Sequence, residues 1–341
     1  MTEVIQNTIT PTAPRKQLSC WVVTDGKIGM ENQCVGLAEA LGLKPLVKRI
    51  KLRTLWRLLT PYLRLGKRFA FSSAGDAIAP PWPDLLITTG RQSIPAALRV
   101  RNASGRRTVC VHIQDPVLDP QRFDLVIVPR HDATRGVGVM TTRGGLHRLS
   151  PSLLAAEANK FRPLFAHLPR PWVAVLIGGT NGVYQLSPRE MVPLVKQITN
   201  MAQETGCGLL VTPSRRTGAD NLAILQAALH DVPHYLWDGT GDNPYYSMLA
   251  LADAILVTCD SVNMVSEAAT TGKPVHVLHL PGGSDKFARF HQALQDDGIT
   301  RPFAGRLEQW HYTPLNDMEL VAARVQALLK QKQLALEVTP S

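Results

Sequence analysis

A polar segment after an apolar run has the residue types of a phosphate and ribose site. Apolar residues 254–257 predict a buried strand, and residues 258–272 predict a turn followed by a short helix. The first N–H groups of a helix lack intrahelical acceptors and attract anions, and Glu267 suits the hydroxyl groups of a ribose. We therefore predict a nucleotide-sugar donor site made by Ser261, Val262, Asn263, Met264, Ser266 and Glu267.

A second polar turn contains a candidate general base. Asp25 follows the apolar residues 18–24 and precedes a helical pattern at 30–41. At the carboxyl end of a first strand, it could take a proton from an acceptor hydroxyl group. The alternative is that Asp25 only caps the helix. Polar residues at the same sheet edge are expected to bind the acceptor: Gly26, Lys27, Gly29, Gln33, Gly90, Arg91, Gln114 and Asp115.

Two further loops are expected to contact the donor. In the first, glycines after the apolar residues 172–177 would let backbone N–H groups approach a pyrophosphate. In the second, residues 213–217, hydroxyl and guanidinium groups could form charge-assisted bonds with phosphates. A tight turn without a ligand is the alternative for the first loop, and a solvated turn is the alternative for Arg216. The predicted contacts are Gly178, Gly179, Thr180, Asn181, Ser214 and Arg215.

Strand-like runs and helical patterns alternate twice along the chain. This alternation predicts an α/β fold with two Rossmann-like domains facing a cleft, the GT-B architecture. A Pro-rich break at 167–171 indicates the boundary, and a last helical pattern is expected to pack back on the first domain. The expected parts are a disordered tail (1–16), an acceptor domain (17–166), a donor domain (167–315) and the returning helix (316–332).

The composition favours a two-domain protein of the cytoplasm. The chain has 341 residues, of which 45% are hydrophobic, so it can bury a large core. Its five cysteines are scattered and form no CxxC pair, which predicts buried free thiols rather than disulfides or structural zinc. It lacks a signal-like apolar segment, a run of about 18 apolar residues and a DxD motif in a binding loop. Export, a membrane span, a metal and a cofactor are therefore not expected.

The net charge of +10 is concentrated in residues 44–68, where Leu, Trp and Tyr separate the cations and no acidic residue occurs. This basic, amphipathic pattern predicts peripheral contact with an anionic membrane surface, at the inner membrane. The alternative is a helix pair whose apolar residues face the protein's own core. Nucleic acid is not expected as a partner, since no binding module accompanies the charge. The cations are Lys44, Lys48, Arg49, Lys51, Arg53, Arg57, Arg64, Lys67 and Arg68.

The motifs together resemble the family of the plant mitochondrial-fission factor "elongated mitochondria" and its bacterial relatives. The resemblance spans residues 18–329 and implies a GT-B glycosyltransferase, as bacterial members are regarded, or a factor that recruits fission machinery, as in plants. It rests on Thr24-Asp25-Gly26-Lys27-x-Gly29-x-x-x-Gln33, Thr88-Thr89-Gly90-Arg91, His112-x-Gln114-Asp115-Pro116, Ile177-Gly178-Gly179 and Ser261-x-x-Met264-x-Ser266-Glu267-Ala268.

Two other GT-B families bear on the site. The segment Ser266-Glu267-x-Ala269-x-x-Gly272-x-Pro274 is similar to the donor-binding segment of the transferase that adds N-acetylglucosamine to the peptidoglycan lipid precursor. This similarity implies that Glu267 contacts the ribose. The first-domain loop departs from that enzyme, and instead resembles the heptosyltransferases of lipopolysaccharide synthesis, which use an Asp there. That resemblance favours Asp25 as the base.

These inferences predict a metal-independent glycosyltransferase that moves a sugar from a nucleotide sugar to a lipid-linked or lipopolysaccharide-type acceptor. Two alternatives stay open. One is a nucleotide-sugar epimerase of GT-B-like fold, which would convert its substrate without an acceptor. The other is a non-catalytic, membrane-associated adaptor, which need not bind a nucleotide sugar.

Overall fold

Apolar segments rich in Val, Ile and Leu form a first sheet that is buried on both faces, as parallel sheets require. The computed structural model describes residues 18–60 and 70–332; the predicted tail at 1–16 and residues 61–68 of the basic segment lie outside them. Six parallel strands pair in the order β2-β1-β3-β4-β5-β6. They are β1 (Cys20–Thr24), β2 (Leu46–Arg49), β3 (Leu85–Thr89), β4 (Val109–Ile113), β5 (Leu125–Pro129) and β6 (Val139–Thr142).

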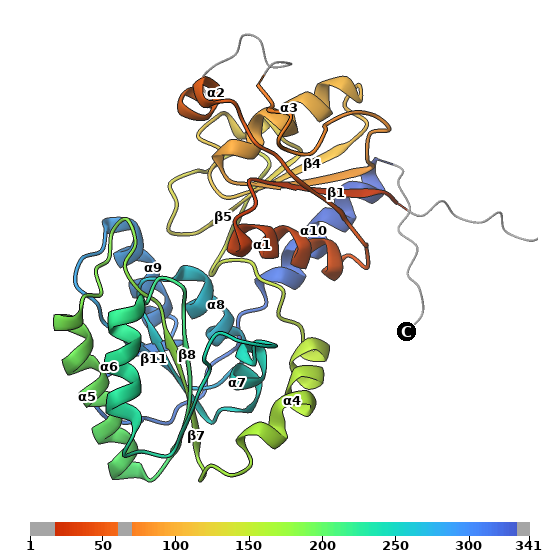
Figure 1. The fold of residues 1–341 in the computed structure, drawn as a ribbon. Coiled ribbons are helices and arrows are strands. Elements are labelled where there is room, and N and C mark those ends of the chain that lie inside the picture. Colours follow the sequence, from red (N-terminus) through yellow and green to blue (C-terminus); the bar gives the residue numbers. More distant parts are fainter. Residues whose placement is uncertain (1–17, 61–69, 333–341) are drawn as a thin grey trace, which may run out of the picture.

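Helices cover both faces of this sheet because alternate strand residues point to opposite sides. Val22 packs with Leu37 and Val325 on one face, whereas Val23 packs with Val100 on the other. The first face is covered by α1 and α10, which lie side by side in Figure 1, and the second by α3. The helices are α1 (Ile28–Ala40), α2 (Thr54–Leu59), α3 (Ile94–Ala103) and α10 (Asp317–Gln331), with short 3-10 turns at Arg91–Ser93 and Pro120–Arg122.

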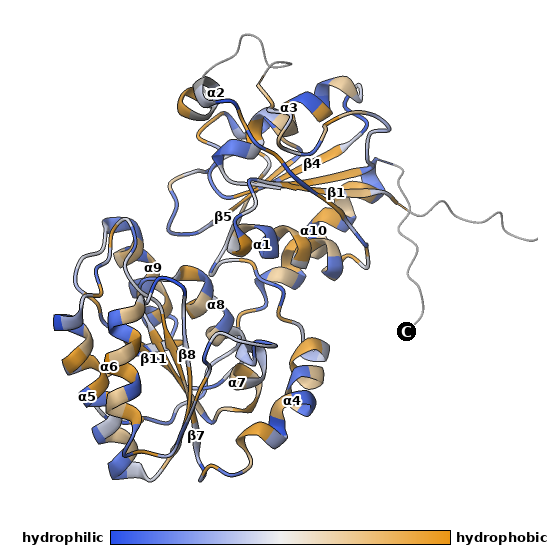
Figure 2. Cartoon of the chain, viewed as in Figure 1, coloured by the Kyte–Doolittle hydropathy of each residue, from blue (hydrophilic) through white to orange (hydrophobic). Residues whose placement is uncertain are grey.

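The second sheet has the same construction. Its strands pair in parallel in the order β12-β11-β10-β7-β8-β9, and Figure 2 shows hydrophobic residues concentrated in the strands of both sheets. The strands are β7 (Trp172–Ile177), β8 (Gly208–Pro213), β9 (His234–Leu236), β10 (Ala254–Thr258), β11 (Val275–Leu278) and β12 (Thr300–Pro302). The helices are α4 (Pro151–Phe165), α5 (Pro188–Thr205), α6 (Ala219–Leu229), α7 (Tyr245–Leu251), α8 (Val262–Thr270) and α9 (Asp285–Asp296).

Helix α4 packs against the second sheet, although its sequence position places it in the predicted first domain. Ala158 and Phe165 belong to the core formed by one face of β7 and β10, and Figure 1 shows α4 beside α7. The Pro-rich segment at 167–171 is therefore a turn within one unit, and the chain crosses between the sheets before Pro151. We call β1–β6 with α1–α3 and α10 the N-terminal lobe, and β7–β12 with α4–α9 the C-terminal lobe.

The strand orders locate the edges where ligands bind in such folds. In each sheet the order reverses beside the first strand, between β1 and β3 and between β7 and β10. The loops that leave the carboxyl ends of strands at such a switch point form the usual ligand crevice of open α/β sheets. The loops that begin at Asp25, Gly90, Gly178 and Cys259 flank the two switch points, and each contains predicted site residues.

Some features of the fold were predicted from the sequence and others were not. All five cysteines are buried free thiols, as predicted. The edge strand β12 was not predicted, because three residues ending in Pro302 show no periodicity. Within the described ranges, no helix is both long enough and apolar enough to cross a membrane.

Candidate functional site

The start of α8 lies at the sheet edge predicted to bind phosphate. Ser261 caps the helix: its backbone is extended and its Oγ accepts a hydrogen bond from the Met264 N–H at 3.3 Å. The N–H groups of Val262 and Asn263, in the first turn, have no acceptor within the helix. The positive end of the helix dipole lies at the same place. The side chain of Met264 packs against the core. The predicted contacts at Ser261, Val262 and Asn263 thus lie at an end of a helix that attracts anions.

The glycine turn after β7 is occupied by hydrogen bonds within the chain. The Gly178 N–H donates to Thr258 Oγ1 at 2.7 Å, and the Gly179 N–H donates to Asp260 Oδ2 at 3.1 Å. A Cβ on Gly178 would overlap the Asp260 carboxylate, so only glycine allows this close approach. Contrary to the sequence-based expectation, these N–H groups are not free for a pyrophosphate, because Asp260 and Thr258 accept from them.

Thr180 and Asn181 also stabilise this turn. Thr180 Oγ1 accepts from the Leu186 N–H at 3.0 Å, and Asn181 Nδ2 donates to the Asp260 carbonyl at 3.0 Å. Asn181 Oδ1 accepts from the next N–H groups of the loop. Both side chains therefore build the turn that was predicted to bind the donor.

Asp260 and Arg216 form an ion pair beside α8 that the sequence analysis did not predict. The Asp260 side chain is fully buried, and it accepts from the Arg216 guanidinium at 2.6 Å and from Thr258 Oγ1 at 2.6 Å. The Arg216 side chain is 44% exposed, so it reaches solvent from this anchor. Arg215 is exposed, and Ser214 Oγ donates to the Gly178 carbonyl at 3.0 Å. Arg216 is thus a cation held at this edge by an ion pair, and not a solvated turn residue. The sequence did offer one sign of such a pair: Asp260 stands between the end of β10 and Ser261, the N-cap of α8.

Glu267 is a buried acid in contact with a phenol. Its Oε2 accepts from the Tyr245 O–H at 2.5 Å, and Tyr245 opens α7. Burial raises the pKa of Glu267 to about 7, although the hydrogen bond from Tyr245 acts to lower it. A ribose hydroxyl group would compete with Tyr245 for this oxygen.

In the N-terminal lobe, Asp25 stands at the carboxyl end of β1 as an ion-paired carboxylate. Lys27 Nζ lies 2.7 Å from Asp25 Oδ2, and the two side chains are 66% and 9% exposed, respectively. The N-cap position of α1 is Lys27, without a side-chain cap. Asp25 Oδ1 accepts from the Lys27 N–H at 3.4 Å. Asp25 is therefore not the N-cap of α1, which was the alternative reading of this residue.

The other predicted acceptor residues lie in two further loops. The backbone of Gly90 has a φ of 74°, and a Cβ there would meet Met30 Cε. The Arg91 guanidinium donates to carbonyl oxygens at the end of α2, those of Thr60 and, at 3.0 Å, Leu58. Arg91 therefore ties α2 to the loop after β3.

The loop after β4 contains the remaining pair of predicted acceptor residues. Gln114 has a φ of 81°, and its N–H donates to the Ile127 carbonyl at 2.7 Å. Asp115 Oδ1 accepts from the Val117 N–H at 2.8 Å. The Asp115 carboxylate thus stabilises its own loop.

Helices α1 and α8 meet across the interface between the lobes. Gln33 Nε2 donates to Asn263 Oδ1 at 2.9 Å, and the position of a Cβ on Gly29 is 3.0 Å from Asn263 Nδ2. Ser266 Oγ accepts from the Gly145 N–H at 2.8 Å and is buried by the segment that joins the lobes. Ser266, which was predicted to bind the donor, therefore contacts the segment that joins the lobes. Gln33 and Asn263 come from opposite lobes and are hydrogen-bonded to each other.

The described part of the basic segment is divided between core and surface. Leu52 is buried, whereas Leu46, Leu58 and Leu59 are exposed, Leu58 by 66%. Lys48 lies over the ring of Trp21, with Nζ 4.3 Å from its centroid. The core-facing alternative thus holds for Leu52. The exposed leucines share residues 44–59 with four exposed cations, Lys44, Arg49, Lys51 and Arg53.

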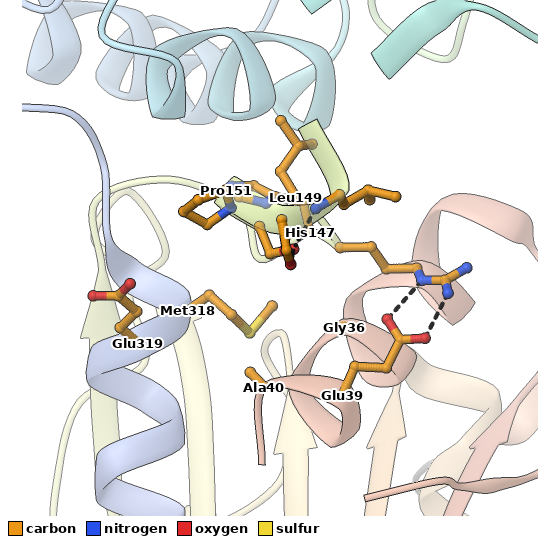
Figure 3. A pocket seen from close by; sticks show the side chains of 12 residues that line it. Gly36, Glu39, Ala40, His147, Leu149, Pro151, Met318 and Glu319 are labelled. Carbon is orange, nitrogen blue, oxygen red and sulfur yellow. Dashed lines mark hydrogen bonds and ion pairs between the residues drawn. The ribbon is translucent and has the colours of Figure 1, made fainter. Parts of the chain in front are cut away.

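A hollow of about 680 Å³ lies where the chain crosses between the lobes. Figure 3 shows it between Glu39 and Ala40 of α1, Leu149 of the crossing segment, Pro151 at the start of α4, and Met318 and Glu319 in the first turn of α10. At one side, Arg148 and Glu39 form a bidentate ion pair of 2.5 and 2.9 Å. None of the predicted site residues lines this hollow. Among the residues that the structure describes, no group of three or more His, Cys, Asp or Glu side chains could hold a metal ion.

Solved structures of similar fold support the architecture. The UDP-GlcNAc 2-epimerase from Methanocaldococcus jannaschii superimposes with a TM-score of 0.53 at 11% identity, over 92% of this chain and 100% of that one. A putative UDP-N-acetylglucosamine 2-epimerase from Listeria monocytogenes gives 0.53 at 10% identity, over 95% and 100%. With the two six-stranded parallel sheets, they show that the fold is GT-B.

Sequence comparison shows the family. The family described as "Mitochondrial fission ELM1" matches residues 28–329. The "Mitochondrial fission protein ELM1" of Arabidopsis thaliana is 30% identical over 396 aligned positions, which cover 92% of each chain. The "Uncharacterized protein RP120" of Rickettsia prowazekii is 26% identical, over 92% of this chain and 99% of that one. This chain therefore belongs to the mitochondrial fission ELM1 family and has the GT-B fold of two Rossmann-like lobes.

Proposed function

We propose that this protein transfers a sugar from a nucleotide-sugar donor to a hydroxyl group of a lipid-linked or lipopolysaccharide-type acceptor. The observation that carries the proposal is the meeting of α1 and α8, which start at the switch points of the two sheets and touch through Gln33 and Asn263. A diphosphate at the start of α8 would direct its sugar toward the loop that contains Asp25.

The donor would be held by charge and by the ribose contact. Arg216 is anchored by Asp260, next in the chain to the cap residue Ser261, and its exposed part could pair with a phosphate. Glu267 is on the same helix, where a ribose would replace the Tyr245 hydrogen bond. These residues provide a cation, a helix dipole and a hydroxyl acceptor for one nucleotide diphosphate.

The reaction would be a single displacement with inversion and without a metal. Asp25 accepts the proton of the acceptor hydroxyl group while that oxygen bonds to the anomeric carbon. The bond from this carbon to the phosphate oxygen breaks, and the nucleoside diphosphate leaves. Arg216 and the start of α8 stabilise the charge on the leaving phosphate. Lys27 Nζ pairs with Asp25 Oδ2 at 2.7 Å, and the acceptor hydroxyl group would take the place of this contact.

The acceptor would be reached at an anionic membrane, on the inner face of the cytoplasmic membrane. Exposed Leu58 and Leu59 on α2, with Lys51 and Arg53 before them, match a segment that lies in the lipid headgroup region. Arg91 joins α2 to the loop after β3. Membrane contact and the acceptor edge of the first sheet therefore belong to one continuous part of the molecule.

A second candidate function follows from the name of the plant relative, which refers to mitochondrial fission. It is a non-catalytic, membrane-associated adaptor. Such a protein would use the basic surface and would not need the start of α8. Substituting Glu267→Ala would then leave its function unchanged.

Binding of nucleotides to the full chain tests the proposal. UDP, GDP and ADP and their sugar conjugates are screened by thermal shift, where a ligand at 100 times its Kd stabilises a protein by about 2.7 kcal/mol. We expect one nucleotide series to stabilise the chain. Conversion of the sugar without an acceptor would identify an epimerase instead, and the absence of any stabilisation would contradict the transferase and favour the adaptor.

Arg216→Ala and Arg215→Ala form a matched pair for the donor site. Loss of a charge-assisted hydrogen bond weakens binding by about ten- to a hundredfold, so we expect this loss for Arg216→Ala by calorimetry with the nucleoside diphosphate. Arg215→Ala should change the affinity by less than about threefold, as for an exposed charge. Equal losses in both variants would show that Arg216 has no special role.

A further inference from the structure

A cavity of about 270 Å³ lies between the lobes, next to the start of α8. Its wall includes Gln33, His131 and Asp132 from the N-terminal lobe and Asn263, Lys286 and Phe287 from the C-terminal lobe. Because both lobes supply polar groups, a molecule bound there would contact both of them. The cavity shares Asn263 with the proposed phosphate site.

Two polar atoms of residues in this wall are buried without a hydrogen-bond partner. They are Gln33 Oε1 and His131 Nδ1, in residues that are only 5% and 4% exposed. The Gln33 amide is oriented, because its Nε2 donates to Asn263. Buried polar atoms are hydrogen-bonded in the great majority of cases. Two exceptions in one cavity wall therefore indicate a polar ligand.

The cavity wall has no net charge. Asp132 Oδ1 and Lys286 Nζ are 2.5 Å apart and neutralise each other across the lobe interface. Burial lowers the pKa of His131 to about 4, so the imidazole is neutral at physiological pH. Arg289 also approaches, but its guanidinium is directed to the His131 carbonyl at 3.4 Å. A phosphate or carboxylate would find no unpaired cation in the wall, whereas hydroxyl groups would find both donors and acceptors.

We propose that this cavity binds one uncharged sugar ring, the sugar to be transferred, through hydroxyl bonds to Gln33 and His131 and contact with Phe287. The inference rests on the proposed function, because a sugar reaches the cavity from a diphosphate at Val262 and Asn263. The volume of about 270 Å³ corresponds to roughly nine waters at about 30 Å³ each, which is room for one sugar ring.

The test compares nucleotide sugars with the matching nucleoside diphosphates on the full chain by calorimetry. The probes are UDP, UDP-glucose, UDP-galactose, UDP-N-acetylglucosamine, GDP, GDP-mannose, ADP and ADP-glucose. The variants are Gln33→Leu and His131→Phe, with Gln292→Leu as the control, since Gln292 is exposed on α9 outside the cavity. Loss of one hydrogen bond predicts about tenfold weaker binding of the nucleotide sugar in each cavity variant.

The pattern across probes decides the inference. We expect the affinity of each variant for the nucleoside diphosphate to stay within about twofold of the wild type, a change below about 0.5 kcal/mol. The nucleotide sugar should bind the two cavity variants more weakly than the wild type and the control. Unchanged conjugate binding in both cavity variants would mean that the cavity holds only water, and would overturn the sugar pocket alone. Equal weakening of conjugate and diphosphate would overturn it too. Binding of no nucleotide at all would overturn the proposed function as well. His131→Phe keeps the test decisive if Gln33→Leu disturbs the contact with Asn263.

Discussion

Two aspartates follow strands at the two switch points, yet their surroundings differ. Asp260, after β10, is fully buried and accepts from Gly179, Thr258 and Arg216. Asp25, after β1, pairs with one cation among the described residues, Lys27, and that lysine is largely exposed. Asp260 therefore joins the loops after β7 and β8 to the end of β10. Within residues 18–60 and 70–332, Asp25 bonds to no other loop, so under the proposed function its carboxylate would exchange Lys27 for the acceptor hydroxyl group.

The comparison shows how one local pattern serves two purposes. A strand, a polar turn and a helix start are present in both lobes, and a carboxylate in such a turn can either satisfy backbone N–H groups or meet a ligand. The donors decide between them: the fully buried Asp260 carboxylate is compensated by donors from three residues, whereas the Asp25 side chain, 9% exposed, is paired with one exposed lysine. Substitutions at the two positions should consequently affect different measurements.

The largest effect is expected for Asp25→Asn. Loss of a general base lowers turnover by about 10² to 10⁴-fold, since the amide cannot accept the proton. The rate of nucleoside diphosphate release in the presence of the acceptor measures this loss. Donor affinity, measured by calorimetry, should stay within about twofold of the wild type, because Asp25 is assigned to the acceptor side. Near-normal turnover in Asp25→Asn would exclude Asp25 as the base, and Asp25 would then no longer differ from Asp260 by a role in catalysis.

The next largest effect is expected on folding, for Asp260→Ala. Leaving a buried donor without its acceptor costs about 1 to 3 kcal/mol of unfolding free energy. Asp260→Ala does this to the Gly179 N–H and to Thr258 Oγ1, while the half-exposed Arg216 can turn to solvent. Asp25→Ala, the matched control, breaks a pair with an exposed lysine and should cost about 1 kcal/mol or less. Urea unfolding of both variants gives the two values. Similar losses would mean that the two aspartates are not distinguished by the donors that surround them.

A smaller effect concerns the pH dependence of stability through Glu267. Its pKa is about 7 in the folded chain against an ordinary value of 4.5, so between these values the folded state holds a proton that the unfolded state releases. The stabilisation is complete below pH 4.5, decreases as the pH rises and is lost above 7, by about 3 kcal/mol in total. In Glu267→Gln this decrease should be absent. The decrease is measured as the difference between the unfolding free energies at pH 5 and pH 8. Equal differences in the wild type and in Glu267→Gln would show that Glu267 does not release its proton between these pH values.

Much of the fold follows from local sequence. Strand β7 and helix α4 begin and end at the predicted residues, because a continuous apolar run and a proline-started amphipathic pattern are local properties. The loops after β1 and β10 were likewise found as polar turns before helices. Once two α/β series were recognised in the sequence, these two loops could be expected to lie at the switch points of the two sheets.

Contacts between distant residues decided the rest. Helix α4 joins the C-terminal lobe through Phe165, and Ser266 is taken by Gly145, although neither pairing has a local pattern. Arg215 and Arg216 are indistinguishable in sequence; only the buried Asp260, 44 residues further on, selects Arg216. The sequence by itself thus determined which segments form strands, helices and polar turns, because backbone propensity and periodicity act over short range. The tertiary structure alone decided which polar groups are satisfied within the protein and which face the cavity between the lobes, because burial and hydrogen-bond partners depend on packing across the whole chain.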